Sequence, residues 1–161
     1  MKTITKAITY LQMTALCLTA ALAGPGADKA VPFKGSIHAV ETSVVQFPTL
    51  LVDGSGSGNA THLGRYTMTS EFEVNLLTLA SIGSGHFIAA NGDSVFTEFI
   101  GQANPLAGTD FSDIVQTHTI TGGTGRFAGA TGSFTVERLL NRVTGVSSGS
   151  FDGTIGFGKA K

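Results

Sequence analysis

The sequence of 161 residues contains no tryptophan, one cysteine, four prolines and only 13% charged residues. The single cysteine, Cys17, cannot form an internal disulfide and cannot supply a zinc site made of several thiolates. So few prolines exclude a proline-rich low-complexity chain, and no glycine recurs at every third position as collagen requires. The formal net charge of −1 gives no basic surface for nucleic acid, so we expect no nucleic-acid partner.

Glycine and apolar residues are what the chain has in quantity. Glycine accounts for 22 of 161 residues, roughly twice its usual share of about 7%. Apolar residues make up 42%, which is enough to bury a core and argues against a disordered chain. The composition predicts a small globular protein punctuated by glycine.

The first 23 residues have the order of a secretory signal peptide. Lys2 and Lys6 form a basic start, an apolar run covers residues 15–23, and the run ends in Ala21-Leu22-Ala23, a small-x-small cleavage pattern. The run is too short to span a bilayer, so we expect no transmembrane segment in the mature chain. We predict cleavage after Ala23 and a secreted or periplasmic protein, from which Cys17 has been removed with the signal.

The remaining chain has the length of one domain. Residues 24–32 are interpreted as a flexible lead-in and residues 33–161 as the folded domain. Residues 62–76 alternate between apolar and polar side chains, which predicts a long strand with one dry and one wet face. The apolar members of this alternation are Tyr66, Met68, Phe72, Val74 and Leu76.

Further strands are expected along most of the folded domain. Asn91-Gly92 separates two β-rich runs and predicts a hairpin, because both residues tolerate positive φ. Residues 46–61, which contain the run Gly54-Ser55-Gly56-Ser57-Gly58, are predicted to be a flexible loop or lid, and residues 103–112 a second loop. Seven or eight strands with almost no helical signal predict a sandwich or a barrel. The expected strands are residues 33–45, 62–76, 84–90, 93–100, 113–121, 133–140 and 148–157.

Residues 121–132 are the most distinctive run of the sequence. Phe127 stands alone there among small residues, and we expect it to plug one end of a barrel. The run begins like a dinucleotide fingerprint, but the residues after it have β character and do not form the helix that such a site requires.

The same run resembles the Gly-Gly-Thr-Gly-x-Phe-x-Gly-Ala-x-Gly segment of the allene oxide cyclase and dirigent superfamily. The resemblance extends more loosely over residues 62–157, and it is nearest to small secreted bacterial members of unassigned activity. It implies a single antiparallel eight-stranded β-barrel, in which this run is a structural corner. The catalytic residues of the plant enzymes lie on other strands that do not align with this chain, so none is transferred.

Two charged residues interrupt apolar strands and are the candidates for chemistry. On its predicted strand, Glu98 points to the same face as Phe96 and Ile100. Arg138 likewise points to the same face as Phe134, Val136 and Leu140. If both of these strand faces point into the lumen, Glu98 and Arg138 form a charged pair in an apolar cavity and are catalytic candidates. The alternative is outward charges or a structural ion pair.

Aromatic and apolar residues on alternating faces are the candidates for ligand binding. An eight-stranded barrel has room either for side chains alone or for one small ligand, so a solid core is the alternative. The four histidines form no His-x-His or His-x-x-x-His pair, and we expect no metal and no cofactor. The candidate ligand-binding residues are Tyr66, Met68, Phe72, Phe96 and Phe134.

Three functions remain open on the sequence. The first is a binding barrel for a small apolar molecule, without catalysis. The second, implied by the resemblance, is a cyclase or isomerase that acts through the shape of its cavity. The third is a structural, envelope-associated protein that forms a homo-oligomer through an exposed apolar patch.

Overall fold

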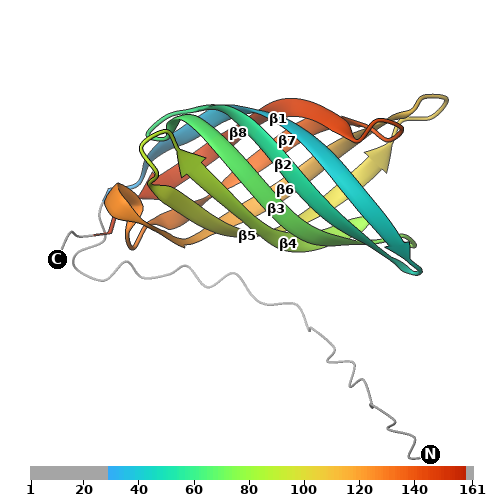
Figure 1. Cartoon of the computed structure of the whole chain (residues 1–161), viewed down its shortest axis with the longest axis horizontal. Coiled ribbons are helices and arrows are strands. Elements are labelled where there is room, and N and C mark those ends of the chain that lie inside the picture. Colours follow the sequence, from blue (N-terminus) through green and yellow to red (C-terminus); the bar gives the residue numbers. More distant parts are fainter. Residues whose placement is uncertain (1–28, 159–161) are drawn as a thin grey trace, which may run out of the picture.

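The computed structural model describes residues 29–158, which form one closed barrel of eight antiparallel strands (Figure 1). Each strand pairs with the next along the chain, and β8 returns to pair with β1. The predicted signal peptide (1–23), most of the predicted lead-in (24–28) and the last residues (159–161) lie outside the described residues. Within the described part, no helix is long and apolar enough to cross a membrane. The strands are β1 (Val31–Gln46), β2 (Thr49–Ala60), β3 (Gly64–Asn75), β4 (Ala80–Ala89), β5 (Ser94–Pro105), β6 (Phe111–Gly123), β7 (Thr131–Asn141) and β8 (Val146–Gly156).

The eight-stranded barrel expected from the sequence is confirmed, and the sandwich alternative is excluded. Closure leaves no unpaired strand edge, which would otherwise be a site of aggregation. In β3, Tyr66, Met68 and Phe72 point inward and are buried, while Glu71 and Glu73 are exposed, so the period-two alternation gives the correct faces.

The prediction of a flexible loop over residues 46–61 is wrong. This stretch is β2, and its glycines are required by close approach and not by flexibility. Gly54, Gly56 and Gly58 all have inward parity. A Cβ on Gly56 would lie 2.4 Å from the carbonyl oxygen of His38, and one on Gly58 would lie 1.9 Å from that of Ser36. The alternating glycines therefore allow β2 to coil tightly against β1.

The second expected loop, residues 103–112, is shorter than predicted. β5 continues to Pro105 and β6 begins at Phe111, which leaves only residues 106–110 as the turn. Pro105 is the last residue of β5, and as a proline it has no N–H to donate to the ladder there.

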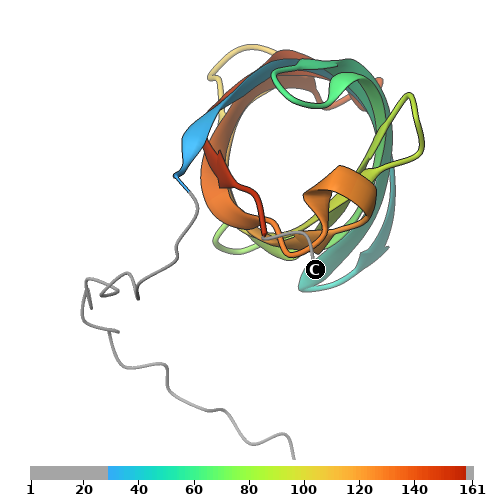
Figure 2. The ribbon, with the colours of Figure 1, turned by 90° about the vertical axis from the view of Figure 1, so that its left-hand side faces the viewer.

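One end of the barrel is packed solid. Its core contains Phe33, Phe87, Phe134 and Phe151 with ring centroids 5.0–6.4 Å apart. The short 3₁₀ helix η1 (Gly125–Phe127) lies over this end, as Figure 2 shows. Phe127 is 0% exposed, so the sequence-based prediction of a plug at this position is confirmed.

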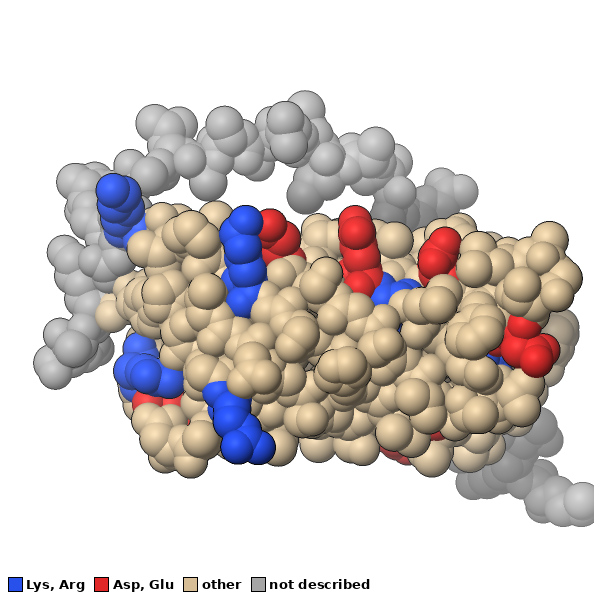
Figure 3. All heavy atoms as spheres, turned by 90° about the horizontal axis from the view of Figure 1, so that it is seen from above, with Lys and Arg blue, Asp and Glu red and all other residues tan. Residues whose placement is uncertain are grey.

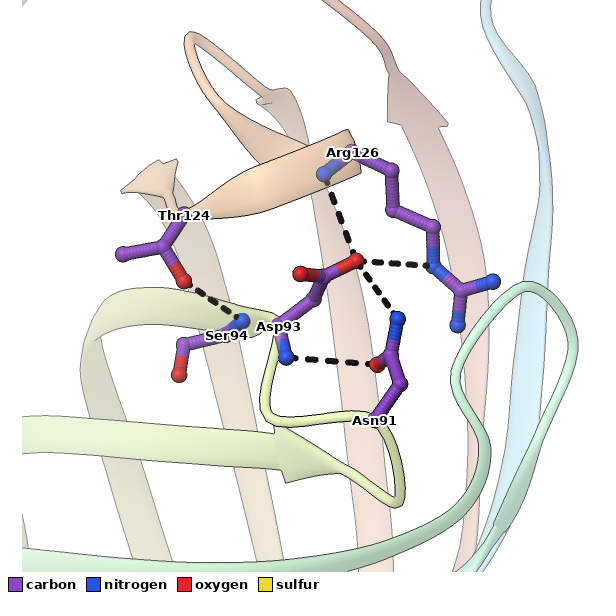
Figure 4. Close-up of polar contacts among 5 residues, drawn as sticks. All are labelled: Asn91, Asp93, Ser94, Thr124 and Arg126. Atoms are coloured by element: carbon purple, nitrogen blue, oxygen red, sulfur yellow. Dashed lines mark hydrogen bonds and ion pairs between the residues drawn. The ribbon is translucent and has the colours of Figure 1, made fainter.

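Asp93 holds the β6–β7 corner against the β4–β5 turn (Figure 4). Its carboxylate accepts hydrogen bonds from the Asn91 side-chain amide at 2.9 Å and from the Arg126 backbone N–H at 3.3 Å. A Cβ on Gly125 would lie 1.8 Å from the same carboxylate. Beside it, the Ser94 N–H donates to the Thr124 hydroxyl. The glycine-rich run is therefore a structural corner.

The hairpin predicted at Asn91-Gly92 is confirmed, with one difference in its backbone. Only Gly92 has a positive φ, of 90°. The Asn91 side-chain oxygen instead accepts the Asp93 N–H at 3.2 Å, which is the local role for which asparagine is favoured in turns.

Gly132 provides a test of how tightly the strands approach. Its φ is +134°, and a Cβ would lie 2.3 Å from the carbonyl oxygen of Thr154. We expect Gly132→Ala to lower the free energy of unfolding by at least about 2 kcal/mol more than Gly122→Ala, measured by urea denaturation. Gly122 is the matched control, because its φ of +151° is as unfavourable for alanine but no atom lies within 4 Å of an added Cβ. Equal losses would mean that φ strain, and not the backbone contact, explains the glycine.

Candidate functional site

The opposite end of the barrel is open. A cavity of about 270 Å³ lies inside it, beneath the β1–β2, β3–β4, β5–β6 and β7–β8 turns. These turns all lie at the right-hand end in Figure 1. Inward-facing side chains near this end of β2, β3, β5, β6 and β7 supply most of the apolar wall, as the alternation of strand residues dictates. The wall includes Leu50, Val52, Phe72, Val74, Leu76, Ile114 and Leu140.

The floor of the cavity is a buried arginine, Arg138 of β7. Its Nη1 forms an ion pair with Glu41 of β1 at 2.5 Å and donates to Ser147 Oγ of β8 at 2.7 Å. Its Nε donates to the Gln116 side-chain oxygen of β6 at 3.4 Å. Gly149 lies beside Arg138 in the β7–β8 register, and a Cβ there would lie 2.7 Å from the Cβ of Arg138.

The arginine is buried but its charge is compensated. The side chain of Arg138 is 5% exposed and that of Glu41 is 11% exposed, so both have lost most of their water. A buried cation is tolerated only when it is paired and hydrogen bonded, and Glu41, Ser147 and Gln116 meet that condition. Arg138 also lines the cavity, so its guanidinium group is a hydrogen-bond donor that a molecule in the cavity would meet.

A second arginine stands at the mouth of the cavity. Arg142, in the β7–β8 turn, donates to the Thr109 carbonyl and to the Ser112 hydroxyl. The cavity lining therefore carries two guanidinium groups and one carboxylate, and it has a net charge of +1. This charge favours molecules with an electron-rich or anionic end.

His118 lies one layer deeper, between the polar floor and the solid core. Its ring stacks on Phe99 at 4.6 Å and on Phe134 at 4.8 Å, and its Nδ1 lies 3.0 Å from Thr97 Oγ1. Burial, with a further contribution from the charge of Arg138, lowers the pKa of His118 to about 3. The ring is therefore neutral at neutral pH. A void of about 20 Å³ beside His118 and Arg138 is large enough for one water molecule.

The candidate ligand-binding residues are distributed over three places. Phe72 lines the open cavity. Tyr66, Met68 and Phe134 belong to the packed half, where the Tyr66 hydroxyl donates to the Ser36 carbonyl at 2.7 Å. Phe96 lies on the outer face, 38% exposed, and its ring packs at a tilt against that of His86. Core filling therefore accounts for three of the five residues.

The pairing of Glu98 with Arg138 does not occur. Val95, Thr97 and Phe99 are the buried residues of this part of β5, so Glu98 is exposed and points outward, as do Phe96 and Ile100. Both faces of β5 carry apolar residues, so the sequence does not show which face points into the barrel. Arg138 does face the lumen, but its partner is Glu41.

Three residues of the polar layer were not identified from the sequence. Glu41 shares inward parity with Ile37 and Ala39, and Gln116 and His118 share it with Ile114 and Ile120. Their position on the same strand face as apolar residues is the sequence signal that indicates an inward orientation. Their meeting with Arg138 depends on the register of β1, β6, β7 and β8, which one sequence does not reveal.

Glu98 belongs instead to a shallow concavity on the outer wall. The concavity has a volume of about 1,020 Å³ and is lined by outward residues of β2 to β6, including Asp53, Glu71 and Glu73. Within the described residues, no three histidine, aspartate, glutamate or cysteine side chains are grouped so that they could hold a metal ion. The carboxylates therefore have the arrangement of a solvated strand face.

The Glu41–Arg138 pair is expected to be worth far more than an exposed pair. Glu41→Gln leaves the guanidinium buried without its counter-charge and should lower the free energy of unfolding by about 3–5 kcal/mol. Asp152→Asn is the control, because it removes an exposed ion pair with Lys34 and should cost less than about 1 kcal/mol. Urea denaturation of both variants measures the difference, and similar losses would contradict the assigned burial.

His118 predicts a specific pH dependence of stability. The unfolded chain takes up a proton on this ring below about pH 6.5, whereas the folded protein does so only near pH 3. Stability is thus lost as the pH falls through this window. Between about pH 6 and pH 4, the wild type should lose about 2 kcal/mol more than His118→Gln. The carboxylates and the other histidines are common to both proteins, so parallel pH profiles would contradict the lowered pKa.

Comparison with known proteins agrees with this architecture. No protein-family model matches the sequence, and no curated protein matches it significantly. Among solved structures, that of the pterocarpan synthase dirigent protein GePTS1 superposes with a TM-score of 0.57 at 12% sequence identity. The match covers 91% of this chain and 99% of that chain. The chain therefore has the eight-stranded barrel fold of a dirigent protein.

Proposed function

We propose that the protein binds one small, mainly apolar molecule in the open half of its barrel. The observation that carries this proposal is the cavity of about 270 Å³ with apolar walls and a single buried arginine at its floor. Ligand sites commonly combine such walls with a few fixed polar groups that set orientation.

Size and polarity narrow the class of ligand. Typical small-molecule pockets measure about 300–1,000 Å³, so a cavity of about 270 Å³ suits a molecule of one or two rings. The guanidinium group of Arg138 at the floor favours a hydroxyl, carbonyl or carboxylate at the inner end of the ligand. The apolar body would then lie against Val52, Phe72 and Leu140.

The prediction is that filling the cavity abolishes binding. Ala103 faces the cavity from β5, and the neighbouring Asn104 faces solvent. With 2-naphthol as a fluorescent two-ring probe, we expect Ala103→Phe to weaken binding at least about tenfold, because the new ring occupies the cavity. Asn104→Phe adds the same side chain outside the barrel and should bind as the wild type does.

The stability of both variants is measured by urea denaturation, so that loss of binding is not confused with loss of folding. If Ala103→Phe unfolds, Ser81→Leu reduces the same cavity from β4 and replaces it. Equal binding by the filled and control variants would contradict the proposal, as would failure of the folded wild type to bind the probe. Native mass spectrometry of protein purified from its source would identify the natural molecule.

A second candidate function is a ring closure or isomerisation directed by the shape of the same cavity. It is favoured by the buried, polar floor, where Arg138 can donate to an oxygen atom of the substrate while the walls fix the conformation of the rest. Isomerisation leaves the mass of the molecule unchanged. Incubation of the copurified molecule with the protein, followed by chromatography, therefore separates conversion from binding alone. In that case Arg138→Gln should slow conversion, and Glu98→Gln, on the outer face, should not.

A further inference from the structure

The mouth of the cavity is surrounded by apolar turn tips. Each of the four turns at this end carries one exposed large apolar side chain. These are Phe47 of the β1–β2 turn (74% exposed), Leu77 of the β3–β4 turn (71%), Leu106 of the β5–β6 turn (37%) and Val143 of the β7–β8 turn (75%). The turns follow every second strand of a closed barrel, so the four tips encircle the opening. We call these four residues the rim.

The closed end of the barrel has no such feature. Its turns are residues 61–63, 90–93 and 124–130, and none of the exposed large apolar residues of the described chain falls within them. The exposed positions there are occupied instead by threonine, histidine, asparagine, arginine, glycine and alanine. The apolar tips are thus a property of one end and not of turns in general.

The rim is also nearly free of charge. The four turns contain one acidic and one basic residue, Asp110 and Arg142, which cancel. On the face seen in Figure 3, most basic side chains lie toward the left-hand end of the barrel and most acidic ones lie in the middle and toward the right. Attraction to the rim would therefore be apolar and not electrostatic.

The geometry distinguishes between a lipid surface and a protein partner. A protein interface has a continuous apolar centre surrounded by a polar periphery. Here the order is reversed, because the apolar groups lie at the periphery and the centre is an opening. A fluid lipid surface can accommodate separate apolar side chains without a complementary shape. The strength of such binding increases with the apolar area that enters the interfacial layer.

We infer that the rim docks on the surface of a lipid bilayer, with the cavity mouth facing the lipid. Phe47, Leu77 and Val143 enter the interfacial layer, and the barrel wall stays in water. In this orientation an apolar molecule passes between lipid and cavity without crossing bulk water. The docking itself does not depend on the proposed ligand.

Tryptophan fluorescence gives a local test, because the full chain contains no tryptophan. Phe47→Trp places a single reporter on the rim, and Ile100→Trp places one on the outer wall at a similarly exposed position, 64%. With phosphatidylcholine vesicles, we expect the emission of Phe47→Trp to shift to shorter wavelength and to be quenched by brominated lipid. The emission of Ile100→Trp should not change. A reporter detects only its own surroundings, so the apolar residues 15–23 of the full chain do not confuse the result.

Partition into the same vesicles supplies the second measurement. Phe47→Ser combined with Leu77→Ser should weaken vesicle binding at least about tenfold relative to the matched wall variant, Ile82→Ser combined with Ile100→Ser. Salt at about 0.5 M should leave the binding unchanged. The rim variant should still bind 2-naphthol, which separates this proposal from the preceding one. An unshifted Phe47→Trp, identical responses of both reporters, or equal partition of the two double variants would each overturn the inference.

Discussion

The ion pair between Arg138 and Glu41 divides the interior of the barrel into two halves of different character. On one side, aromatic rings from five strands fill the lumen up to the plug at Phe127. On the other side, the inward residues leave a cavity. A charged pair stripped of water is stable only when its remaining hydrogen-bonding groups are satisfied. Ser147, Gln116 and Glu41 must therefore keep their places around the guanidinium, and this fixes four strands relative to one another.

The packed half and the open half have complementary roles in this arrangement. The packed half supplies most of the buried apolar surface and so most of the driving force for folding. Glycines at inward positions of β2 and β8 allow the close strand approach that this packing requires. The open half keeps a cavity, which costs stability because its lining residues lack packing partners. It also carries the apolar rim. The proposed binding and docking functions use the part of the molecule on which folding depends least.

Much of the fold could be predicted from one sequence because its signals are local. Strict alternation in residues 62–76 gave the correct faces of β3, Asn91-Gly92 marked a hairpin, and the glycine-rich run around Phe127 indicated the barrel corner. The incorrect prediction of a flexible loop at residues 46–61 also comes from reliance on local signals. Alternating glycine and serine has the composition of a flexible linker, and only the neighbouring backbone of β1 shows that a side chain would not fit there.

The candidate site was predicted only in part, because it depends on contacts between distant strands. The sequence by itself determined that Arg138 interrupts an apolar strand and that Phe72 belongs to a dry face. It did not determine which face of β5 points into the barrel, because both faces carry apolar residues. The sequence therefore indicated Glu98, and not Glu41, as the partner of Arg138. Register and barrel closure decided these points, because they bring β1, β6 and β8 around Arg138. Residue type determined which chemical groups the protein has. The closed sheet determined which of these groups are buried next to one another, because pairing between distant strands sets their positions.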